Sequence, residues 1–330
     1  MKRLAFIIGM LVLIVPYCTK DPDPDMVYDP TPYEVEYPEN FPILEVPADN
    51  PTTVEGVLLG RMLYYDPILH KDSTEACADC HQQAFSFSKP GNIIPHLNLG
   101  WSSAFLWNGK IQGSLEDIMF FESKEFFETD LSRIQAHPDY PDLFFEAFGS
   151  KEVSYENIAK AMAQFERTLV SSNSKYDRYL DPNQLVFLED EEFFGFDIFF
   201  SEKGDCFHCH GGILFTDNRF HNNGLDEEPE AGLFEITGIS EDVGRFKTPT
   251  LRNIELTGPY MHDSRYETLE EVIDFYSEGL NESPTIDPLM KNAHQGGIQL
   301  TEAEKGYLIA FLKTLTDTSY TQKPELGSPF

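Results

Sequence analysis

The stretch STEACADCHQQAFSFSKP, residues 73–90, contains Cys77, Cys80 and His81 in the order C-x-x-C-H. Three kinds of site use such a stretch: a redox dithiol, one half of a zinc site, and the covalent anchor of a haem. They differ in what they require elsewhere in the chain. Zinc needs further ligands but no histidine directly after the second cysteine, a thioredoxin-type dithiol needs only one such motif, and a haem anchor needs that adjacent histidine.

A second stretch of the same form, CFHCH, carries Cys206, Cys209 and His210. The chain has five cysteines, and all of them except Cys18 belong to these two motifs. A zinc site or a single dithiol gives no reason for a histidine at the same position in both pairs. The sequence therefore predicts two covalently bound haems c, with the thiols on the vinyl groups and each motif histidine, His81 or His210, on an iron.

The overall composition is that of a folded protein. The 330 residues are 41% hydrophobic and 13% aromatic, which is enough for two domains of ordinary size. With 24 basic and 56 acidic residues the formal net charge is −32. Such a chain repels the phosphate backbone, so we expect no nucleic-acid partner. A basic protein or a neutral small molecule suits this charge better.

The N-terminal residues predict an export signal. Lys2 and Arg3 precede an apolar run, residues 4–15, that is too short to span a bilayer, and the segment ends at Cys18. Residues 1–17 resemble a lipoprotein signal peptide, with Cys18 as the lipid anchor. The Pro- and Asp-rich residues 18–50 predict an extended tether. We expect a protein of the periplasm or cell surface of a Gram-negative bacterium, lipid-anchored to the outer membrane.

Four stretches have helical patterning. Residues 54–65 precede an Asp-Pro break, residues 154–172 form an amphipathic pattern that Ser154 can cap, and residues 301–317 form another with Thr301 as cap. Residues 189–200 are the fourth, and each haem motif follows a helix. The predicted fold is mostly α, with few short strands and long loops. It contains two cytochrome c-like haem domains, residues 51–185 and 186–330.

Several longer stretches carry a specific resemblance. The chain resembles the bacterial dihaem cytochrome c peroxidase family, including its relative that matures the quinone of methylamine dehydrogenase. The matching stretches follow the family order over nearly the whole chain after the tether. They include LGRMLYYDPIL, NLGWSSAFLWNGK, AMAQFERTLVSSNSKYDRYL, FFSEKGDCFHCHGG, FTDNRFHNNGL, FKTPTLRNIELTGPYMHDSRYETLEEVIDFY and LTEAEKGYLIAFLKTLTD.

The resemblance implies a role for each haem. The first would reduce peroxide and the second would pass electrons in from a donor, with His81 and His210 as the proximal ligands. Trp107 matches the tryptophan that bridges the two haems. Glu128, in EFFETD, matches the carboxylate that acts as acid and base on peroxide, with Glu125 and Glu122 as alternatives.

Two departures from the family pattern concern the first haem. Ile118 stands where the family usually has a glutamine near the peroxide, which puts a full peroxidase rate in doubt. The loop after His81, which in many members supplies a second histidine ligand, is much shorter. His96 is the only histidine near enough to substitute for it. We therefore expect an open iron position opposite His81.

The second haem has two candidate ligands opposite His210. Tyr276 occupies the aligned position, as in the quinone-maturing relative, whereas the classical peroxidases have a methionine there. Met290 is the alternative. A phenolate would stabilise ferric and higher-valent iron, and a thioether would favour ferrous iron.

The family also holds one Ca²⁺ between its domains. Its pattern maps to the Asn92 side chain and to the backbone carbonyls of Thr257 and Pro259, a small oxygen set that water would complete. His262 matches a family histidine near the second haem and receives no ligand role. The remaining histidines are expected at the surface or beside haem propionates: His70, His137, His208, His221 and His294.

Three functions follow as hypotheses. The first is a peroxidase that reduces H₂O₂ to water with electrons from a small cytochrome c or cupredoxin. The second is peroxide-driven oxidation of a protein or organic substrate through a bis-ferryl state, which a Tyr276 ligand would favour. The third is a non-enzymatic electron-transfer cytochrome with two six-coordinate haems. A homodimer, common in the family, is compatible with each of them.

Overall fold

The structure is a computed structural model that describes residues 27–91 and 93–330. The predicted signal peptide, the predicted lipid anchor Cys18 and the predicted calcium ligand Asn92 lie outside the described residues. Among the described residues, no helix combines the length and the apolar character needed to cross a bilayer.

The fold is mostly helical, as predicted, with two small antiparallel two-stranded sheets in the described residues. The helices are α1 (Val54–Tyr65), α2 (Cys77–Cys80), α3 (Leu115–Phe121), α4 (Leu131–Gln135), α5 (Tyr140–Phe148), α6 (Tyr155–Arg167), α7 (Lys175–Leu180), α8 (Asp190–Phe199), α9 (Phe207–His210), α10 (Phe234–Thr237), α11 (Leu269–Glu278) and α12 (Glu302–Lys313). The strands are β1 (Ala104–Phe105), β2 (Ile111–Gln112), β3 (Phe220–His221) and β4 (Phe246–Lys247). A π-helical turn, Glu122–Phe126, continues α3.

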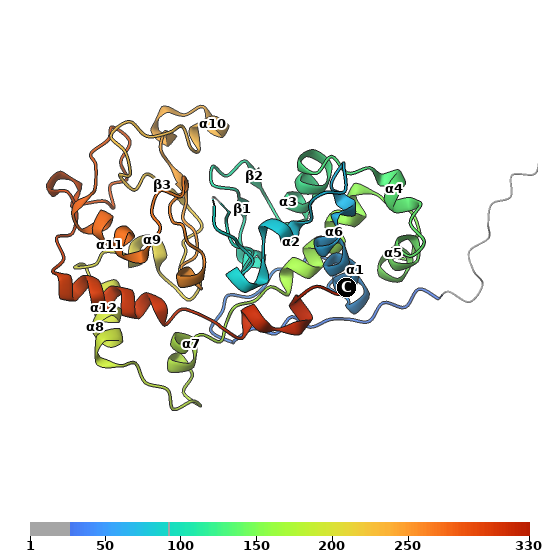
Figure 1. Ribbon diagram of the computed structural model, residues 1–330, viewed down its shortest axis with the longest axis horizontal. Helices are drawn as coiled ribbons and strands as arrows, with labels where there is room; N and C mark the ends of the chain where they lie inside the picture. Colours follow the sequence, from blue (N-terminus) through green and yellow to red (C-terminus); the bar gives the residue numbers. More distant parts are fainter. Residues whose placement is uncertain (1–26, 92) are drawn as a thin grey trace, which may run out of the picture.

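Two lobes share one design (Figure 1). In the first, α1 crosses α6, and a Cβ added at Gly60 would lie 2.0 Å from the Ala161 carbonyl oxygen. In the second, α8 crosses α12, and a Cβ at Gly195 would lie 1.9 Å from the Tyr307 carbonyl oxygen. Each lobe therefore needs a glycine at the helix crossing. In both lobes the haem motif follows the helix that carries this glycine.

Capping side chains fix the helix starts. Ser154 accepts a hydrogen bond from Asn157 N at the start of α6, and Thr301 accepts one from Glu304 N at the start of α12. The first helix ends at Tyr65, and Asp66, directly before Pro67, is its C-cap. These starts and this end confirm the boundaries expected from the sequence.

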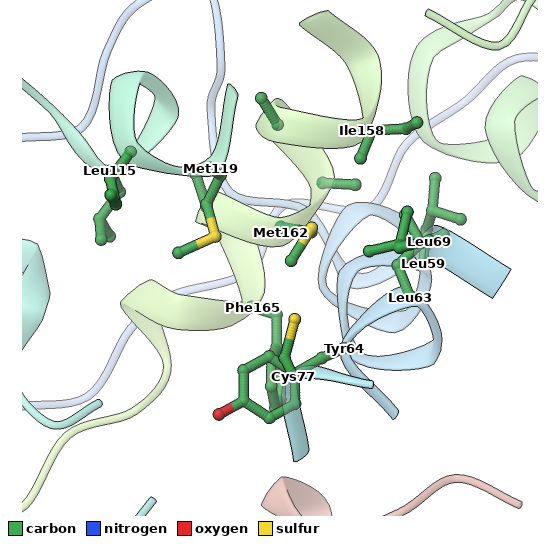
Figure 2. Close-up of a cluster of buried hydrophobic side chains, with 14 of the residues drawn as sticks. Leu59, Leu63, Tyr64, Leu69, Cys77, Leu115, Met119, Ile158, Met162 and Phe165 are labelled. Atoms are coloured by element: carbon green, nitrogen blue, oxygen red, sulfur yellow. The ribbon is translucent and has the colours of Figure 1, made fainter. Parts of the chain in front are cut away.

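The core of the first lobe lies between α1, α3 and α6 (Figure 2). Its buried side chains include Leu59, Leu63, Met119, Ile158 and Met162, and Cys77 of the first haem motif lies beside Tyr64 and Phe165. The second lobe has a separate aromatic core built on α8, α11 and α12, which includes Phe199, Phe215 and Phe311. Each haem motif thus borders its own core.

The chain ends tie the lobes together. The final residues run from α12 in the second lobe back to α1 in the first (Figure 1). Tyr320 and Leu326 are buried in the core of the first lobe, and Arg61 Nε donates to the Gly327 carbonyl at 2.6 Å. From the N-terminal side, Phe41 of the predicted tether is buried. The C-terminal segment thus contacts residues of the first lobe from beyond the predicted division at residues 185/186. That division stays a prediction from the sequence.

A buried ion pair holds α7 on the second lobe, because Asp177 follows Tyr176 of the second core. Arg252 is 1% exposed and donates to both carboxylate oxygens of Asp177, at 2.9 and 2.7 Å. It also donates to the Ile213 carbonyl at 2.8 Å, and its guanidinium lies 4.8 Å from the centre of the Phe41 ring. Because Arg252 has several acceptors, its charge is compensated without solvent.

Candidate functional site

The first haem motif begins with the four-residue helix α2. The helical turn brings His81 N to 2.8 Å from the Cys77 carbonyl and turns the imidazole back toward the core. His81 Nδ1 lies 3.0 Å from the Phe87 carbonyl oxygen, so Nδ1 carries the proton and Nε2 keeps its lone pair. Desolvation lowers the pKa of His81 well below its usual range, which keeps the ring neutral. A neutral imidazole with a free Nε2 is what an iron ligand requires.

The second motif repeats this arrangement. His210 ends helix α9, and its Nδ1 lies 3.1 Å from the Phe215 carbonyl oxygen. Desolvation again lowers the pKa of the imidazole. The four cysteines that the structure describes form no disulfide. Both motifs therefore offer two thiols and one oriented imidazole, which fits a covalently attached haem c at each.

A cavity adjoins the second motif. Its volume is about 240 Å³, and its walls are mostly apolar. Cys206, Cys209 and His210 line one part of it, and Trp107 lies at its border with the first lobe. A cavity with this chemistry fits the second haem.

Both candidate axial ligands line this cavity. Tyr276, on α11, accepts a hydrogen bond from Asn223 Nδ2 at 3.1 Å, and desolvation raises its pKa to about 12. Met290 lies in the loop between α11 and α12 and also lines the cavity. The choice between Tyr276 and Met290 stays a prediction. Asn223 and Met261, which lies 3.7 Å from the Asn223 amide, were not identified from the sequence, because nothing in their local pattern marks them.

Two cationic side chains of the cavity wall were assigned no specific role from the sequence. Lys247 is buried, donates to Asn218 Oδ1 at 2.9 Å, and has a pKa lowered to about 8 by desolvation. His221 lies between Asp217 at 2.8 Å and Asp287 at 2.7 Å, and these carboxylates raise its pKa. Lys247 is therefore the buried cation best able to pair with a haem propionate.

Trp107 lies where the two lobes meet. It belongs to the turn between β1 and β2, a hairpin that extends from the first lobe toward the second (Figure 1). Its carbonyl accepts a hydrogen bond of 2.8 Å from Lys247 N in β4 of the second lobe. At the tip of the turn, a Cβ at Gly109 would lie 2.4 Å from the Phe220 ring. The hairpin thus holds Trp107 against the wall of the second cavity.

A buried acid lies beside the first motif. The Glu166 carboxyl is completely buried, and its Oε1 lies 2.8 Å from His96 Nδ1. Burial raises the pKa of Glu166 to about 8 and lowers that of His96 to about 3, so the proton of this pair resides on Glu166 at neutral pH. Glu166 lies in AMAQFERTLVSSNSKYDRYL, one of the stretches that resemble the family, but its sequence pattern did not indicate a role.

His96 stacks on His81. The two ring centroids are 3.4 Å apart and the ring planes differ by 21°. The two imidazoles therefore lie face to face, whereas two histidines that held one iron between them would have to point a ring nitrogen toward each other. In this arrangement His96 is a neighbour of the proximal ligand and does not lie where a second axial ligand would.

The three candidate acids have different environments. Glu128 is exposed and pairs with Lys71 at 2.6 Å, which lowers its pKa. Glu125 is also exposed. Glu122, in the π-helical turn, has a pKa raised to about 7, chiefly by desolvation and also by Glu166. Ile118, the residue in place of the family glutamine, packs in the first core.

The remaining predicted residues are near the second cavity or at the surface. Thr257 and Pro259 line the second cavity, while the third calcium ligand lies outside the described residues, so the calcium site stays a prediction. His262 stacks on Phe246, with ring centroids 3.5 Å apart. His208 lies 3.0 Å from Asp205 near Lys291. His70, His137 and His294 do not line the cavity beside the second motif.

Sequence comparison relates the chain to dihaem enzymes. The model of the family described as di-haem cytochrome c peroxidase matches residues 54–184. The methylamine utilization protein MauG of Methylorubrum extorquens is 34% identical over 304 residues, which cover 84% of this chain and 82% of that protein. The cytochrome c551 peroxidase of Nitrosomonas europaea is 31% identical over 301 residues, covering 84% of each.

Structural comparison agrees. The crystal structure of a MauG-like protein associated with microbial copper homeostasis superposes with a TM-score of 0.82 at 34% identity, covering 90% of this chain and 99% of that one. The diheme peroxidase BthA of Burkholderia thailandensis shares the fold at 17% identity, with a TM-score of 0.69. Together with the two oriented histidines and the cysteine pairs, these matches show that the chain belongs to the di-haem cytochrome c peroxidase family.

Proposed function

We propose that this enzyme reduces hydrogen peroxide to water at the haem held by His81, with electrons delivered through the haem held by His210. The observation that carries the proposal is the pair of equivalent imidazole sites, each with Nδ1 bound to a carbonyl and Nε2 free, joined by the hairpin of Trp107. When bound, haem iron supplies the redox chemistry of peroxide cleavage. Trp107 is the proposed bridge for the electrons.

The open position opposite His81 is supported by the stacking of His96. Because His96 lies face to face with His81 and its Nδ1 contacts Glu166, it would have to leave both partners to bind iron from the other side. Peroxide would then meet no competing histidine from this loop. A resting-state EPR spectrum tests this point. A high-spin ferric signal is expected, and two low-spin haems alone would instead favour the non-enzymatic electron-transfer cytochrome.

Peroxide cleavage needs a group that takes a proton from one oxygen and returns it to the other. We propose Glu128 for this role because it aligns with the carboxylate of the family. Glu122 has the better environment for this work, because its pKa of about 7 lets it exchange a proton at neutral pH. The exposed Glu128, paired with Lys71, stays ionised.

The electron donor is proposed to be a small cytochrome c or a cupredoxin with a basic surface, because the net charge of −32 would attract it. The test is steady-state turnover of the dihaem protein with H₂O₂ and a reduced donor of this kind. Consumption of the donor above the free-haem background is expected. Turnover equal to that background would refute the peroxidase proposal.

A second candidate function is the peroxide-driven oxidation of a protein or organic substrate. Tyr276 favours it, because it lines the second cavity and a phenolate ligand would stabilise oxidised iron. Adding H₂O₂ to the diferric protein without a donor should then give a long-lived oxidised spectrum. Immediate bleaching, or no change, would argue against this candidate.

The remaining parts of the proposal concern place and assembly. We propose lipidation at Cys18, a location in the periplasm or at the cell surface, one Ca²⁺ held by Asn92, Thr257 and Pro259, and a homodimer. Family membership supports these features only in general. Mass spectrometry of the mature N-terminus, calcium analysis and light scattering test them in turn.

A further inference from the structure

An apolar surface is exposed where the chain enters α8. Leu185 is 91% exposed and Phe187 74%, and Phe193 and Phe194 are each about half exposed. We call these four side chains the α8 patch. They belong to the start of α8 and to the loop before it, which extends from the lower edge of the molecule (Figure 1). Single exposed apolar residues are ordinary, but four large ones gathered in one segment indicate a contact surface.

The core does not need the exposed members of this segment. Val186 and Leu188 are partly buried, whereas Leu185 and Phe187 are exposed, an alternation that is typical of an extended segment with one side turned inward. The inward pair already supplies the apolar contacts of the segment. The outward pair is therefore free to contact another molecule.

The surroundings of the α8 patch are acidic. Residues 179–202 contain seven acidic residues and no lysine or arginine. Glu192 pairs with Lys175, whereas Glu189, Asp190 and Glu191 form no ion pair in the described part of the chain. A partner whose apolar face is ringed by basic residues would complement both features. A second copy of this chain would not, because a two-fold interface sets the same acidic residues against each other.

The opposite side of α8 reaches the second haem cavity. Phe199 is 1% exposed and lines that cavity. Aromatic contacts connect it to the patch, with ring centroids 6.2 Å apart for Phe193 and Phe196, 5.1 Å for Phe196 and Phe200, and 4.9 Å for Phe200 and Phe199. These contacts stay within one helix, whose diameter with side chains is about 10–12 Å. A partner on the patch would thus be close to the haem held by His210.

We propose that the α8 patch is the docking surface for the electron donor, a small redox protein whose apolar contact face is ringed by lysine or arginine. The inference deepens the proposed function and rests on it, because it names where that donor binds. The acidic residues around the patch attract and orient the donor, and burial of the four apolar side chains holds it.

The test measures binding of a lysine-rich small cytochrome c to the diferric full-length protein, by isothermal titration calorimetry without peroxide. Saturable binding is expected, and succinylation of the cytochrome lysines, which reverses their charge, should abolish it. Phe187→Ser and Phe193→Ser should each raise the Kd about tenfold or more, because each removes a buried apolar contact. Ile43→Ser, at an 84% exposed apolar residue outside the patch, should leave the Kd unchanged.

A second pair of variants tests the acidic surroundings. Glu191 and Glu156 are both exposed and occupy the second position of a helix, in α8 and α6 respectively. Glu191→Gln should raise the Kd about two- to fivefold, and this increase should shrink at high salt. Glu156→Gln, the matched change in the first lobe, should leave the Kd unchanged.

No saturable binding, a Kd that the two phenylalanine variants leave unchanged, or an equal loss of affinity in Ile43→Ser would overturn the inference. So would patch variants that change only the self-association of the protein in analytical ultracentrifugation, because a second copy would then occupy the surface. Turnover of the unsubstituted protein with H₂O₂ and the same reduced cytochrome is measured separately. Absence of turnover would refute the proposed function and leave the binding result standing, whereas unchanged binding in the patch variants would refute only this surface.

Discussion

Asn253 Nδ2 donates a 2.7 Å hydrogen bond to Ser86 Oγ, and both side chains are fully buried. Ser86 lies five residues after the ligand His81, and Asn253 belongs to the second lobe. The Oδ1 atom of Asn253 accepts from Asp317 N at 2.6 Å. One amide side chain therefore joins the loop of the first haem, the second lobe and the C-terminal segment.

Replacing Asn253 by alanine should destabilise the protein strongly. The change removes these hydrogen bonds and leaves the Asp317 N–H without its acceptor. It also places alanine at φ 57°, a left-handed conformation that asparagine tolerates better. We expect a loss of about 2–4 kcal/mol in the free energy of unfolding, measured by denaturant titration with circular dichroism.

Two variants separate the causes. Asn253→Gly keeps the backbone conformation favourable and loses only the side chain, so it should cost less than Asn253→Ala. Ser86→Ala loses one hydrogen bond and should cost about 1–3 kcal/mol, because the Asn253 amide is left buried without that acceptor. A stability equal to that of the unsubstituted protein in Asn253→Ala would show that the amide does not join the lobes.

The pH dependence of the peroxide reaction should identify the catalytic acid. Glu122 has a pKa raised to about 7, so its base form is scarce at pH 5 and predominates above pH 8. If Glu122 is the base, the rate constant for H₂O₂ should rise with pH around a midpoint near 7. Glu122→Gln should abolish this rise and lower the rate constant about 10²- to 10⁴-fold, measured by stopped-flow spectroscopy.

Glu128→Gln provides the comparison. Lys71 lowers the pKa of Glu128, which is therefore ionised throughout this range. A rate that is independent of pH from about 5.5 to 8 and falls only in Glu128→Gln would assign the role to Glu128, as the family alignment predicts.

The ligand opposite His210 can be identified by substitution. Tyr276→Phe removes the phenol oxygen and should change the EPR signal of the second haem, because the proposed ligand is lost. Met290→Leu keeps the volume and should leave the spectrum unchanged. The reverse pattern would assign the ligand to Met290.

Asn223 gives a further measurement on the same ligand. Its amide donates to the Tyr276 oxygen at 3.1 Å and would weaken electron donation from a phenolate to iron. Asn223→Ala should therefore lower the reduction potential of the second haem, measured by spectroelectrochemical titration. An unchanged potential would show that the tyrosine oxygen does not bind the iron.

The position of Trp107 should depend on Gly109. An alanine there would adopt an unfavourable φ of 69°, and its Cβ would lie 2.4 Å from the Phe220 ring. Gly109→Ala should displace the hairpin, cost about 1–3 kcal/mol in stability and slow electron transfer between the haems, measured by flash photolysis.

Gly306 provides the control for this change. It lies inside α12, and an added Cβ there meets no atom within 4 Å. Gly306→Ala should stabilise the protein by about 0.5–1 kcal/mol without changing the rate of electron transfer. Equal rates in both variants would refute the role of the hairpin in holding the bridge.

Local patterns predicted much of this molecule. The C-x-x-C-H motifs, the Ser154 and Thr301 caps and the break at Pro67 act within a few residues, so four of the helices and both haem anchors could be predicted directly. The resemblance to a known family then located Trp107 and Tyr276, which local patterns alone would not distinguish from core residues.

The remaining features depend on contacts between distant residues. The raised pKa of Glu122 results from its surroundings, and a glutamate in a highly acidic chain has no local mark of that environment. The same is true of the Asn223 bond to Tyr276 and of the stacking of His96 on His81. Such pairings depend on which segments the fold brings together, and one sequence does not reveal them.

The C-terminal segment has a bearing on folding. Tyr320, whose hydroxyl donates to the His96 carbonyl at 2.5 Å, and Leu326 belong to the core beside the first haem motif. Both residues follow the second lobe in the chain, so the core of the first lobe is built from segments that lie on either side of the second lobe in sequence. The surroundings of Cys77 therefore stay incomplete until this segment has packed against α1.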